Sequence, residues 1–290
     1  MDRSLTDSEK SKHKKEIAWT QRSRKNRLFF LIVFFALVAE SVISNKLSEL
    51  QANKVDYGES YGYAPNPEAY HDAVIQVYSA RTRGPKGMFA VHCWIATKRQ
   101  NADHYIVSQV IGWRGNYVFV EQLVPDKSWY GNEPVLHLDL RGEEYENVID
   151  KIEVAVGNYP WAGDYTIYPG PNSNTFVSWI GKQVPELGLD LPSTAIGKDW
   201  RPIDEALGMS SSGTGVQASL LGLVGATAGY QEGLEVYFLG LNFELDLFDM
   251  ALEIPIFGRY NLWWLVVFCV GWFTFGYLKR KRLEAKAETF

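Results

Sequence analysis

One stretch near the middle of the chain, PGPNSNTF from Pro169 to Phe176, constrains the fold more than any other. Two prolines and a glycine force a tight, stiff turn. The Asn-Ser-Asn-Thr run that follows favours the start of a helix, because such side chains accept hydrogen bonds from free backbone N–H groups. Apolar residues then recur at helical spacing until Pro185. The pattern predicts a helix that begins near Ser173.

Ser173 is the first candidate for chemistry. The turn delivers it to the first turn of the helix, where backbone N–H groups point at any negative charge. A nucleophile or an anion site is found at such a position, and so is an ordinary capping serine. Asn172, Asn174 and Thr175 flank it and are candidate binding residues for the same reason.

His92 is the candidate base. The alternation from Met88 to Thr97 predicts a strand that places Cys93 on one face and His92 on the other. A strand histidine could take the proton from a hydroxyl at a helix start. His104 is the candidate third, orienting group, with Asp199 as the alternative. The competing interpretation is that His92 packs as a core residue and Ser173 only caps the helix.

Two further features are candidate binding residues. Lys198 and Asp199 could supply charge near the central turn, or they could form an ion pair that pins a loop. Trp129, in the loop PDKSWYGNEP, could form the lip of a ligand site or plug a gap in the core. The two cysteines show no spacing with histidine that is typical of zinc, so we expect neither a metal nor a cofactor.

The charge distribution suggests a membrane protein. Residues 1–27 hold nine Lys/Arg against four Asp/Glu, whereas residues 46–259 hold fifteen against twenty-seven. Each basic end adjoins an apolar run, and the run between Arg259 and Lys279 has nineteen uncharged residues. The positive-inside rule predicts that both termini lie in the cytoplasm and that the main domain lies outside, which in a bacterial protein means the inner membrane and a periplasmic domain. The acidic middle argues against nucleic acid as a partner.

The expected organisation has seven parts. They are a cytoplasmic basic tail (1–27), a transmembrane helix (28–46), a linker (47–71), an extracytoplasmic α+β domain (72–207), a Gly-rich apolar segment plus a strand (208–258), a second transmembrane helix (259–279) and a second cytoplasmic basic tail (280–290). The first helix is expected to be an uncleaved signal anchor, with a cleaved signal peptide as the alternative.

Within the main domain, alternation predicts strands at 74–78, 88–97, 105–113, 117–124 and 135–140. Apolar spacing predicts a helix at 143–159. Strands followed by helices indicate an α+β fold with a mainly antiparallel sheet and packed helices. The stretch 208–230 remains open between a helix, a loop and a segment that dips into lipid. The stretch 234–247 alternates as one strand.

Several blocks together resemble an uncharacterised family of proteobacterial membrane-associated proteins. They include PGPNSNTF, the HCWI strand, LPSTAIGKDW and EGLEVYFLGLNF, and the resemblance covers roughly residues 75–259. More distantly, the order of His92 and Asn172-Ser173 resembles the permuted NlpC-type and lecithin-retinol-acyltransferase-like papain folds. Those proteins have an Asn-Cys pair at the helix start, so Ser173 stands where they have the cysteine.

These observations support three functional hypotheses. The first is an inner-membrane protein whose outer domain is a non-catalytic binding or assembly module for membrane lipid, an envelope component or another membrane protein. The second is a serine-dependent amidase, esterase or acyltransferase acting on envelope peptide or lipid, with Ser173 as nucleophile and His92 as base. The third is an accessory subunit of a larger membrane complex.

Overall fold

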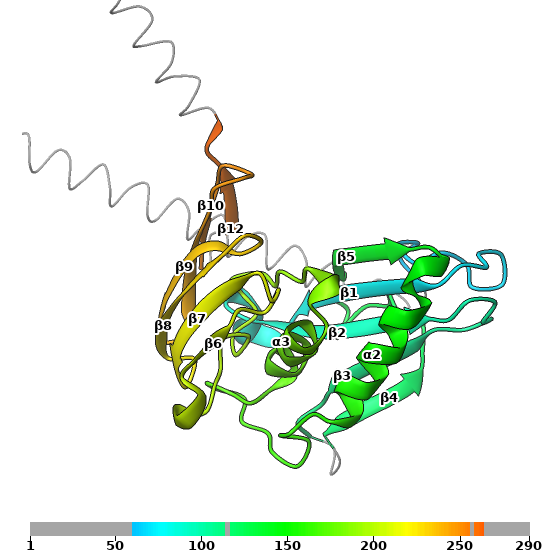
Figure 1. Ribbon diagram of the computed structural model, residues 1–290, viewed down its shortest axis with the longest axis horizontal. Helices are drawn as coiled ribbons and strands as arrows, with labels where there is room; N and C mark the ends of the chain where they lie inside the picture. The colour runs from blue at the N-terminus through cyan, green and yellow to red at the C-terminus, as the bar shows by residue number, and fades with distance from the viewer. Residues whose placement is uncertain (1–59, 114–116, 256–257, 264–290) are drawn as a thin grey trace, which may run out of the picture. The chain divides into compact units, whose positions relative to one another are not determined.

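The structure is a computed structural model that describes residues 60–113, 117–255 and 258–263. The chain divides into two units between Leu47 and Ser48, and every described residue belongs to the second unit. This unit contains two antiparallel sheets built from successive parts of the chain, with two α-helices between them in sequence (Figure 1).

The first sheet has the strand order β4-β3-β2-β1-β5. Its strands are β1 (Val74–Arg81), β2 (Val91–Lys98), β3 (Ile106–Val110), β4 (Val118–Gln122) and β5 (Val135–Arg141). The helices α2 (Glu146–Gly157) and α3 (Ser173–Gln183) lie on one face of this sheet (Figure 1). Short 3₁₀ helices occur at Gly84–Met88, Glu143–Tyr145, Pro185–Leu187 and Ile203–Glu205.

The main hydrophobic core lies between the first sheet and the two helices. Cys93 and Ile95 of β2 pack there with Ile149 of α2 and Phe176 of α3, and all four are fully buried. Trp94 points to the opposite face of β2 and joins a second apolar cluster. The predicted alternation of this strand is therefore confirmed, and it places His92 on the face away from the helices.

The second sheet is a meander with the strand order β12-β11-β10-β9-β8-β7-β6. Its strands are β6 (Leu207–Met209), β7 (Gly215–Leu220), β8 (Val224–Gly229), β9 (Gly233–Phe238), β10 (Leu241–Asp246), β11 (Ala251–Ile254) and β12 (Gly258–Asn261). Each strand pairs with its neighbour in sequence, so the sheet needs only short turns.

The two faces of the second sheet are reversed relative to an ordinary amphipathic sheet. The buried face carries polar side chains, among them Gln217, Thr227, Glu235 and Glu244, each at most 3% exposed. The other face carries aliphatic and aromatic side chains that are exposed, such as Val236 at 61%. Sheets normally bury the apolar side and leave the polar side in water, so this arrangement requires polar partners inside.

The structure overturns the expected fold class. We predicted a permuted papain-like α+β domain with one main sheet, packed helices and two flanking transmembrane helices. The described residues instead form two antiparallel sheets with only two short α-helices. Among these residues, no helix has the length and the hydropathy needed to cross a membrane. The predicted fold class is therefore wrong.

The structure describes only a small part of the two predicted transmembrane segments. Residues 28–46 lie outside the described part of the chain, and so do residues 264–279 of the second segment. Its first residues, Arg259 to Asn261, belong to strand β12 rather than to a helix. The basic tails, 1–27 and 280–290, also lie outside the described residues.

The region 208–258 differs most from the expectation. The Gly-rich stretch 208–230 forms the strands β7 and β8 and the end of β6, not a helix, a loop or a lipid-dipping segment. The stretch 234–247 forms two strands, β9 and β10, joined by a turn in which Leu239 and Gly240 have positive φ angles. Because Phe238 pairs with Leu241 across this turn, the outward side chains are even-numbered on β9 and odd-numbered on β10, a change of phase that one alternating strand does not predict.

Candidate functional site

The start of helix α3 is held by a capping box. The side chain of Asn172 accepts hydrogen bonds from the backbone N–H groups of Asn174 and Thr175, at 2.9 and 3.2 Å. The hydroxyl of Thr175 accepts in return from the backbone N–H of Asn172 at 3.0 Å. The capping residue is therefore Asn172, and Ser173 is the first residue of the helix.

The capping box is also bound to the segment 196–198. The amide of Asn172 donates to the carbonyl of Ile196 at 3.1 Å, and the hydroxyl of Thr175 donates to that of Gly197 at 2.7 Å. Gly197 has φ +97°, and a Cβ there would overlap the side chain of Asn172. The AIGKDW block therefore needs its glycine to approach the helix start this closely.

Asn174 connects the helix start to strand β2. Its Oδ1 accepts from the backbone N–H of Cys93 at 3.0 Å, and its Nδ2 donates to the carbonyls of Val91 and Ile196 at 3.0 and 2.9 Å. The side chain is 3% exposed. Asn174 thus bonds to the backbone on both sides of His92 and fixes the helix start beside that residue.

His92 is held by Gln109 and by an aromatic ring. Its Nε2 bonds to Oε1 of Gln109 at 2.9 Å, and its ring stacks on Trp129 with centroids 3.9 Å apart. Because a carbonyl oxygen only accepts, Nε2 carries the proton and Nδ1 is the accepting nitrogen. Burial lowers the pKa of His92 from 6.5 to about 4. The imidazole is therefore neutral at pH 7.

Ser173 lies near His92 but is not bonded to it. The hydroxyl of Ser173 donates to Oδ1 of Asn174 at 3.4 Å, and within the described residues no hydrogen bond joins Ser173 to His92. Both residues line one cavity of about 550 Å³. The structure brings the two side chains into one space without the contact that a serine–histidine pair uses for proton transfer.

This cavity, which we call the aromatic cavity, has a mostly apolar wall. Its apolar lining comes from five separate segments and consists of Phe89, Ala90, Val91, Trp113, Trp129, Tyr130, Tyr165, Ile167, Tyr168 and Ile196. Its polar lining includes His92, Asn172, Ser173 and Asn174 on one side and Thr82, Arg83 and Lys86 on another. Cavities with an apolar wall and a few polar groups are typical small-molecule sites.

The loop around Trp129 forms part of the wall. Trp129 pairs with Asn132 by two backbone hydrogen bonds of 2.9 and 3.0 Å, across a turn in which Tyr130 and Gly131 have positive φ angles. This turn presents Tyr130, which is 41% exposed, and holds Trp129 against His92. The loop is therefore both a support for His92 and a rim of the cavity.

His104 does not lie with these residues. It pairs with the adjacent Asp103 at 2.6 Å, its side chain is 38% exposed, and it lines a different cavity. Gln109 is the group that bonds to His92 instead. The sequence analysis did not single out Gln109, because its place beside His92 depends on the register of β2 and β3.

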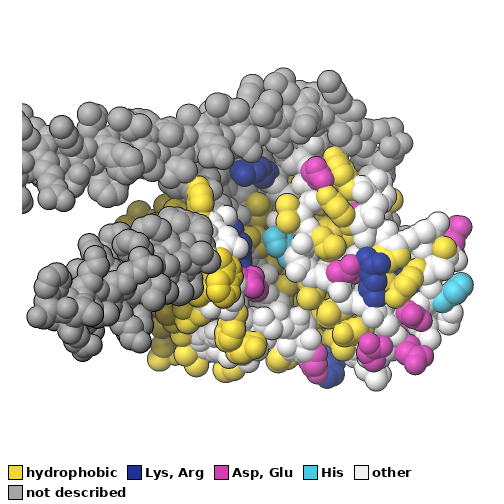
Figure 2. Space-filling model, turned by 90° about the horizontal axis from the view of Figure 1, so that it is seen from above, with side chains coloured by type: hydrophobic (Ala, Val, Ile, Leu, Met, Phe, Trp, Pro, Cys, Tyr) yellow, Lys and Arg dark blue, Asp and Glu magenta, His cyan; other side chains and the backbone are white. Residues whose placement is uncertain are grey.

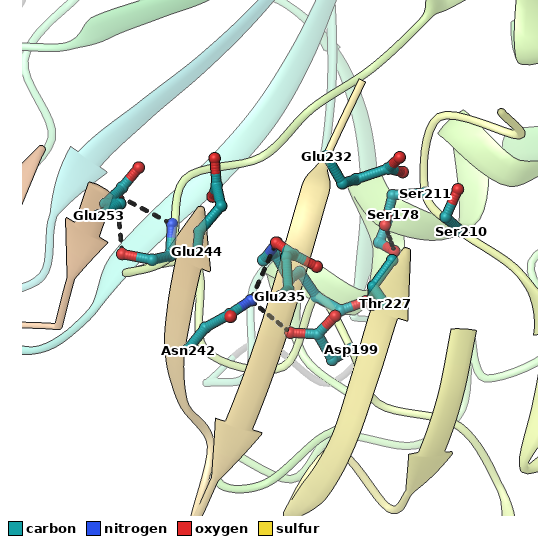
Figure 3. Close-up of polar contacts among 12 residues, drawn as sticks. Ser178, Asp199, Ser210, Ser211, Thr227, Glu232, Glu235, Asn242, Glu244 and Glu253 are labelled. Atoms are coloured by element: carbon teal, nitrogen blue, oxygen red, sulfur yellow. Dashed lines mark hydrogen bonds and ion pairs between the residues drawn. The ribbon is translucent and has the colours of Figure 1, made fainter. Parts of the chain in front are cut away.

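Lys198 and Asp199 are buried and bond to side chains of the second sheet, and neither lines the aromatic cavity. Figure 3 shows Asp199 beside Glu235 and Asn242. Lys198 forms an ion pair with Glu235, and Asp199 accepts hydrogen bonds from Gln217 at 2.7 Å and from Asn242 at 3.3 Å. We call these residues, with Asp190 and Glu244, the buried polar cluster. It joins the segment after α3 to strands β7, β9 and β10.

The buried polar cluster holds more carboxyl groups than cations. Burial raises the pKa of Glu244 to about 9 and that of Asp190 to about 7. Burial alone would lower the pKa of Lys198, but Glu235 and its neighbours hold it well above the usual value. Carboxylate oxygens of Asp190, Glu235 and Glu244 lie within 4.8 Å of one another, close enough to hold a cation, and Lys198 supplies a positive charge there.

The part of the chain that forms the aromatic cavity is similar to a family of unknown function. Residues 72–200 match the model of a family described as a protein of unknown function, DUF3750. The match covers the first sheet, both α-helices and the aromatic cavity, and it ends before β6. No curated protein and no solved structure matches the chain significantly. The match agrees with the expected relation to an uncharacterised family and adds no activity.

Proposed function

We propose that this domain binds, without covalent chemistry, a ligand that combines an apolar body with an anionic group, and that the aromatic cavity is the binding site. The observation that carries the proposal is the lining itself. Aromatic and aliphatic side chains form most of the wall, and two basic residues, Arg83 and Lys86, lie on one side. An acyl or aromatic body suits the wall, and a carboxylate or phosphate suits the basic side.

The state of the polar groups favours binding over catalysis. Ser173 makes only a long hydrogen bond, to Asn174. The side-chain amide of Asn174 is already bonded to the backbone of β2. His92 is buried, and its lowered pKa makes it a weak base. These groups are suited to orient a polar end of the ligand at the helix start.

The test measures the binding of parinaric acid, a fluorescent fatty acid, to the full chain held in an amphipathic polymer. Ile167 lines the cavity and is 58% exposed, whereas Ile203 is 65% exposed and lies outside it. Ile167→Glu should weaken binding about tenfold or more, equivalent to about 1.4 kcal/mol, and Ile203→Glu should leave binding unchanged. Equal affinities of the two variants would rule out the cavity as the site.

A second experiment tests the basic side. The double variant Arg83→Gln/Lys86→Gln should weaken binding of the acid but not of its methyl ester, which lacks the charge. Lys151→Gln, which removes one exposed positive charge from α2, is the control for loss of charge outside the cavity. If the acid and the ester respond alike, the ligand is apolar only.

A serine-dependent acyl transferase or hydrolase is the second candidate. The observation in its favour is that Ser173 and His92 line the same cavity, with Nε2 of His92 held by Gln109 and Nδ1 left as acceptor. This candidate requires that a fluorophosphonate probe label Ser173 and that His92→Ala abolish the label. The binding proposal requires that Ser173 remain unlabelled under the conditions in which parinaric acid binds.

A further inference from the structure

The exposed face of the second sheet is apolar over five adjacent strands, β6 to β10. Every outward position on these strands is Val, Leu, Ala, Met or Phe. We call this surface the outer face. Its exposed side chains include Val216 (65%), Leu220 (51%), Val224 (47%), Val236 (61%), Phe238 (61%) and Phe243 (46%).

Strand register makes the outer face one continuous surface. Val236 lies opposite Ala226 on β8 and Phe243 on β10, and Val224 lies opposite Phe238. With strands about 4.8 Å apart and about 20 Å long, the surface measures on the order of 500 Å². Figure 2 agrees: hydrophobic side chains gather at the left, over the second sheet, and charged ones at the right. A patch of this size is comparable to the largest apolar patch that a typical monomer exposes, and such patches are often functional.

The buried polar face of the second sheet, which we call the inner face, determines that the apolar face is the exposed one. Glu235, Asn242 and Glu244 point inward and join Lys198 and Asp199 in the buried polar cluster (Figure 3). If the apolar face were the buried one, its aliphatic side chains would pack against the polar segment after α3, and Lys198 would lose its ion pair with Glu235. The alternation of polar and apolar residues therefore fixes which face is outside.

We propose that the outer face lies against the acyl chains of a lipid bilayer surface. The first reason is its composition. Even in homodimers only about 65% of the buried interface area is non-polar, because both protein partners contribute polar groups to the interface. Across β6 to β10 the outer face has no polar side chain. Acyl chains, which offer no hydrogen-bonding group, are the partner that matches such a surface.

The second reason is that the aromatic cavity adjoins the outer face. Tyr168 lines the aromatic cavity and donates a hydrogen bond of 2.8 Å to the carbonyl of Leu239, in the turn between β9 and β10. Leu239 and Phe238 are both more than half exposed there. The apolar surface thus continues to the cavity, whose residues Arg83 and Lys86 are exposed and suit anionic headgroups.

The third reason is the sequence that follows the sheet. Strand β12 ends at Asn261, and residues 264–278 contain no charged side chain. Such an uncharged, mostly apolar run favours an apolar environment, and it follows the sheet directly in sequence.

The test places a fluorescent label at three valines of matched exposure, in full chains that carry Cys269→Ser. Val216→Cys and Val236→Cys lie on the outer face, and Val154→Cys, at 62% exposure, lies on helix α2 as the control. Each protein is reconstituted with vesicles of phosphatidylcholine and phosphatidylglycerol. Quenching is measured with a lipid that carries a nitroxide on its acyl chain and with aqueous iodide. Cys93 is buried, and the parent with Cys269→Ser reports its residual labelling.

The proposal requires that the nitroxide lipid remove at least half of the emission at Val216 and Val236 and little at Val154, with iodide showing the opposite order. Quenching of all three positions by iodide alone would overturn it. Protection of the outer-face labels from both quenchers, together with a dimeric mass, would also overturn it and would assign the surface to a second copy of the chain. The two labelled positions on different strands guard against a local effect of either substitution.

Discussion

Among single residues, His92 gives a definite dependence of stability on pH. Burial lowers its pKa to about 4, so the unfolded chain binds a proton at higher pH than the folded protein does. The stability that neutral His92 allows is fully present above about pH 6.5 and is lost as the pH falls towards 4. A difference of this size corresponds to about 3 kcal/mol.

We therefore predict that the melting temperature falls less between pH 7 and pH 4.5 in His92→Gln than in the unsubstituted protein. His104→Gln, at a partly exposed histidine outside the aromatic cavity, is the control substitution. His137 is buried with a similarly lowered pKa and remains in all three proteins, so only the difference between them is interpreted. Parallel slopes for His92→Gln and the unsubstituted protein would contradict the assignment.

The residue scale also shows how far the candidate site could be predicted. The sequence motif brought Asn172, Ser173 and Asn174 to a helix start because capping preferences are local. Period-two alternation placed His92 on the correct face. Gln109 was missed because the register between β2 and β3 depends on tertiary packing, and alternation along either strand does not reveal it.

At the scale of elements, strand β8 depends on Gly225. Tyr237 of β9 lies across this glycine and donates a hydrogen bond of 3.0 Å to the carbonyl of Ala218 on β7. A Cβ at Gly225 would collide with that carbonyl and with the Tyr237 hydroxyl. The absence of a side chain therefore lets Tyr237 bridge three strands.

We predict that Gly225→Val destabilises the protein by about 2 kcal/mol through overpacking and the lost hydrogen bond. Ala226→Val, at the next residue on the exposed face, should change stability little. Thermal unfolding of both variants in mild detergent measures the difference. A similar loss for both would mean that β8 tolerates no larger side chain on either face.

The elements also explain why half of the fold was predicted poorly. Strands β1 and β2 and the two helices have strong apolar periodicity, so their positions were predicted from sequence. The second sheet has Gly, Ser and Ala in β7 and β8, which give weak contrast between faces, and it buries carboxylates that alternation rules assign to solvent. The physical cause is the buried partner Lys198, which lies far away in sequence.

For the molecule as a whole, Lys198 couples the two sheets. It follows the segment bonded to the start of α3 and pairs with Glu235 on β9, with both side chains at most 3% exposed. Removing one partner of a buried pair leaves an unpaired charge and typically costs about 3–5 kcal/mol. Exposed pairs contribute about 0–1 kcal/mol.

We predict that Lys198→Met opens the second sheet before the first. Hydrogen exchange should show faster exchange at amides of β9 and β10, while β1 and β2 keep their protection. Lys151→Met, which breaks the exposed pair with Glu186, is the control and should leave both sheets protected. Uniform loss of protection in Lys198→Met would instead indicate a single cooperative unit.

The buried polar cluster also bears on where this protein can be divided. The family model stops at Trp200, yet the side chains that neutralise Lys198 and bond to Asp199 come from β7, β9 and β10. A fragment that ends at that boundary would expose Lys198 and Asp199 without their partners from the second sheet. The isolated second sheet would expose Glu235 and Glu244 without Lys198. The smallest piece worth expressing for crystallisation therefore runs to Asn261, beyond the limit that sequence similarity suggests.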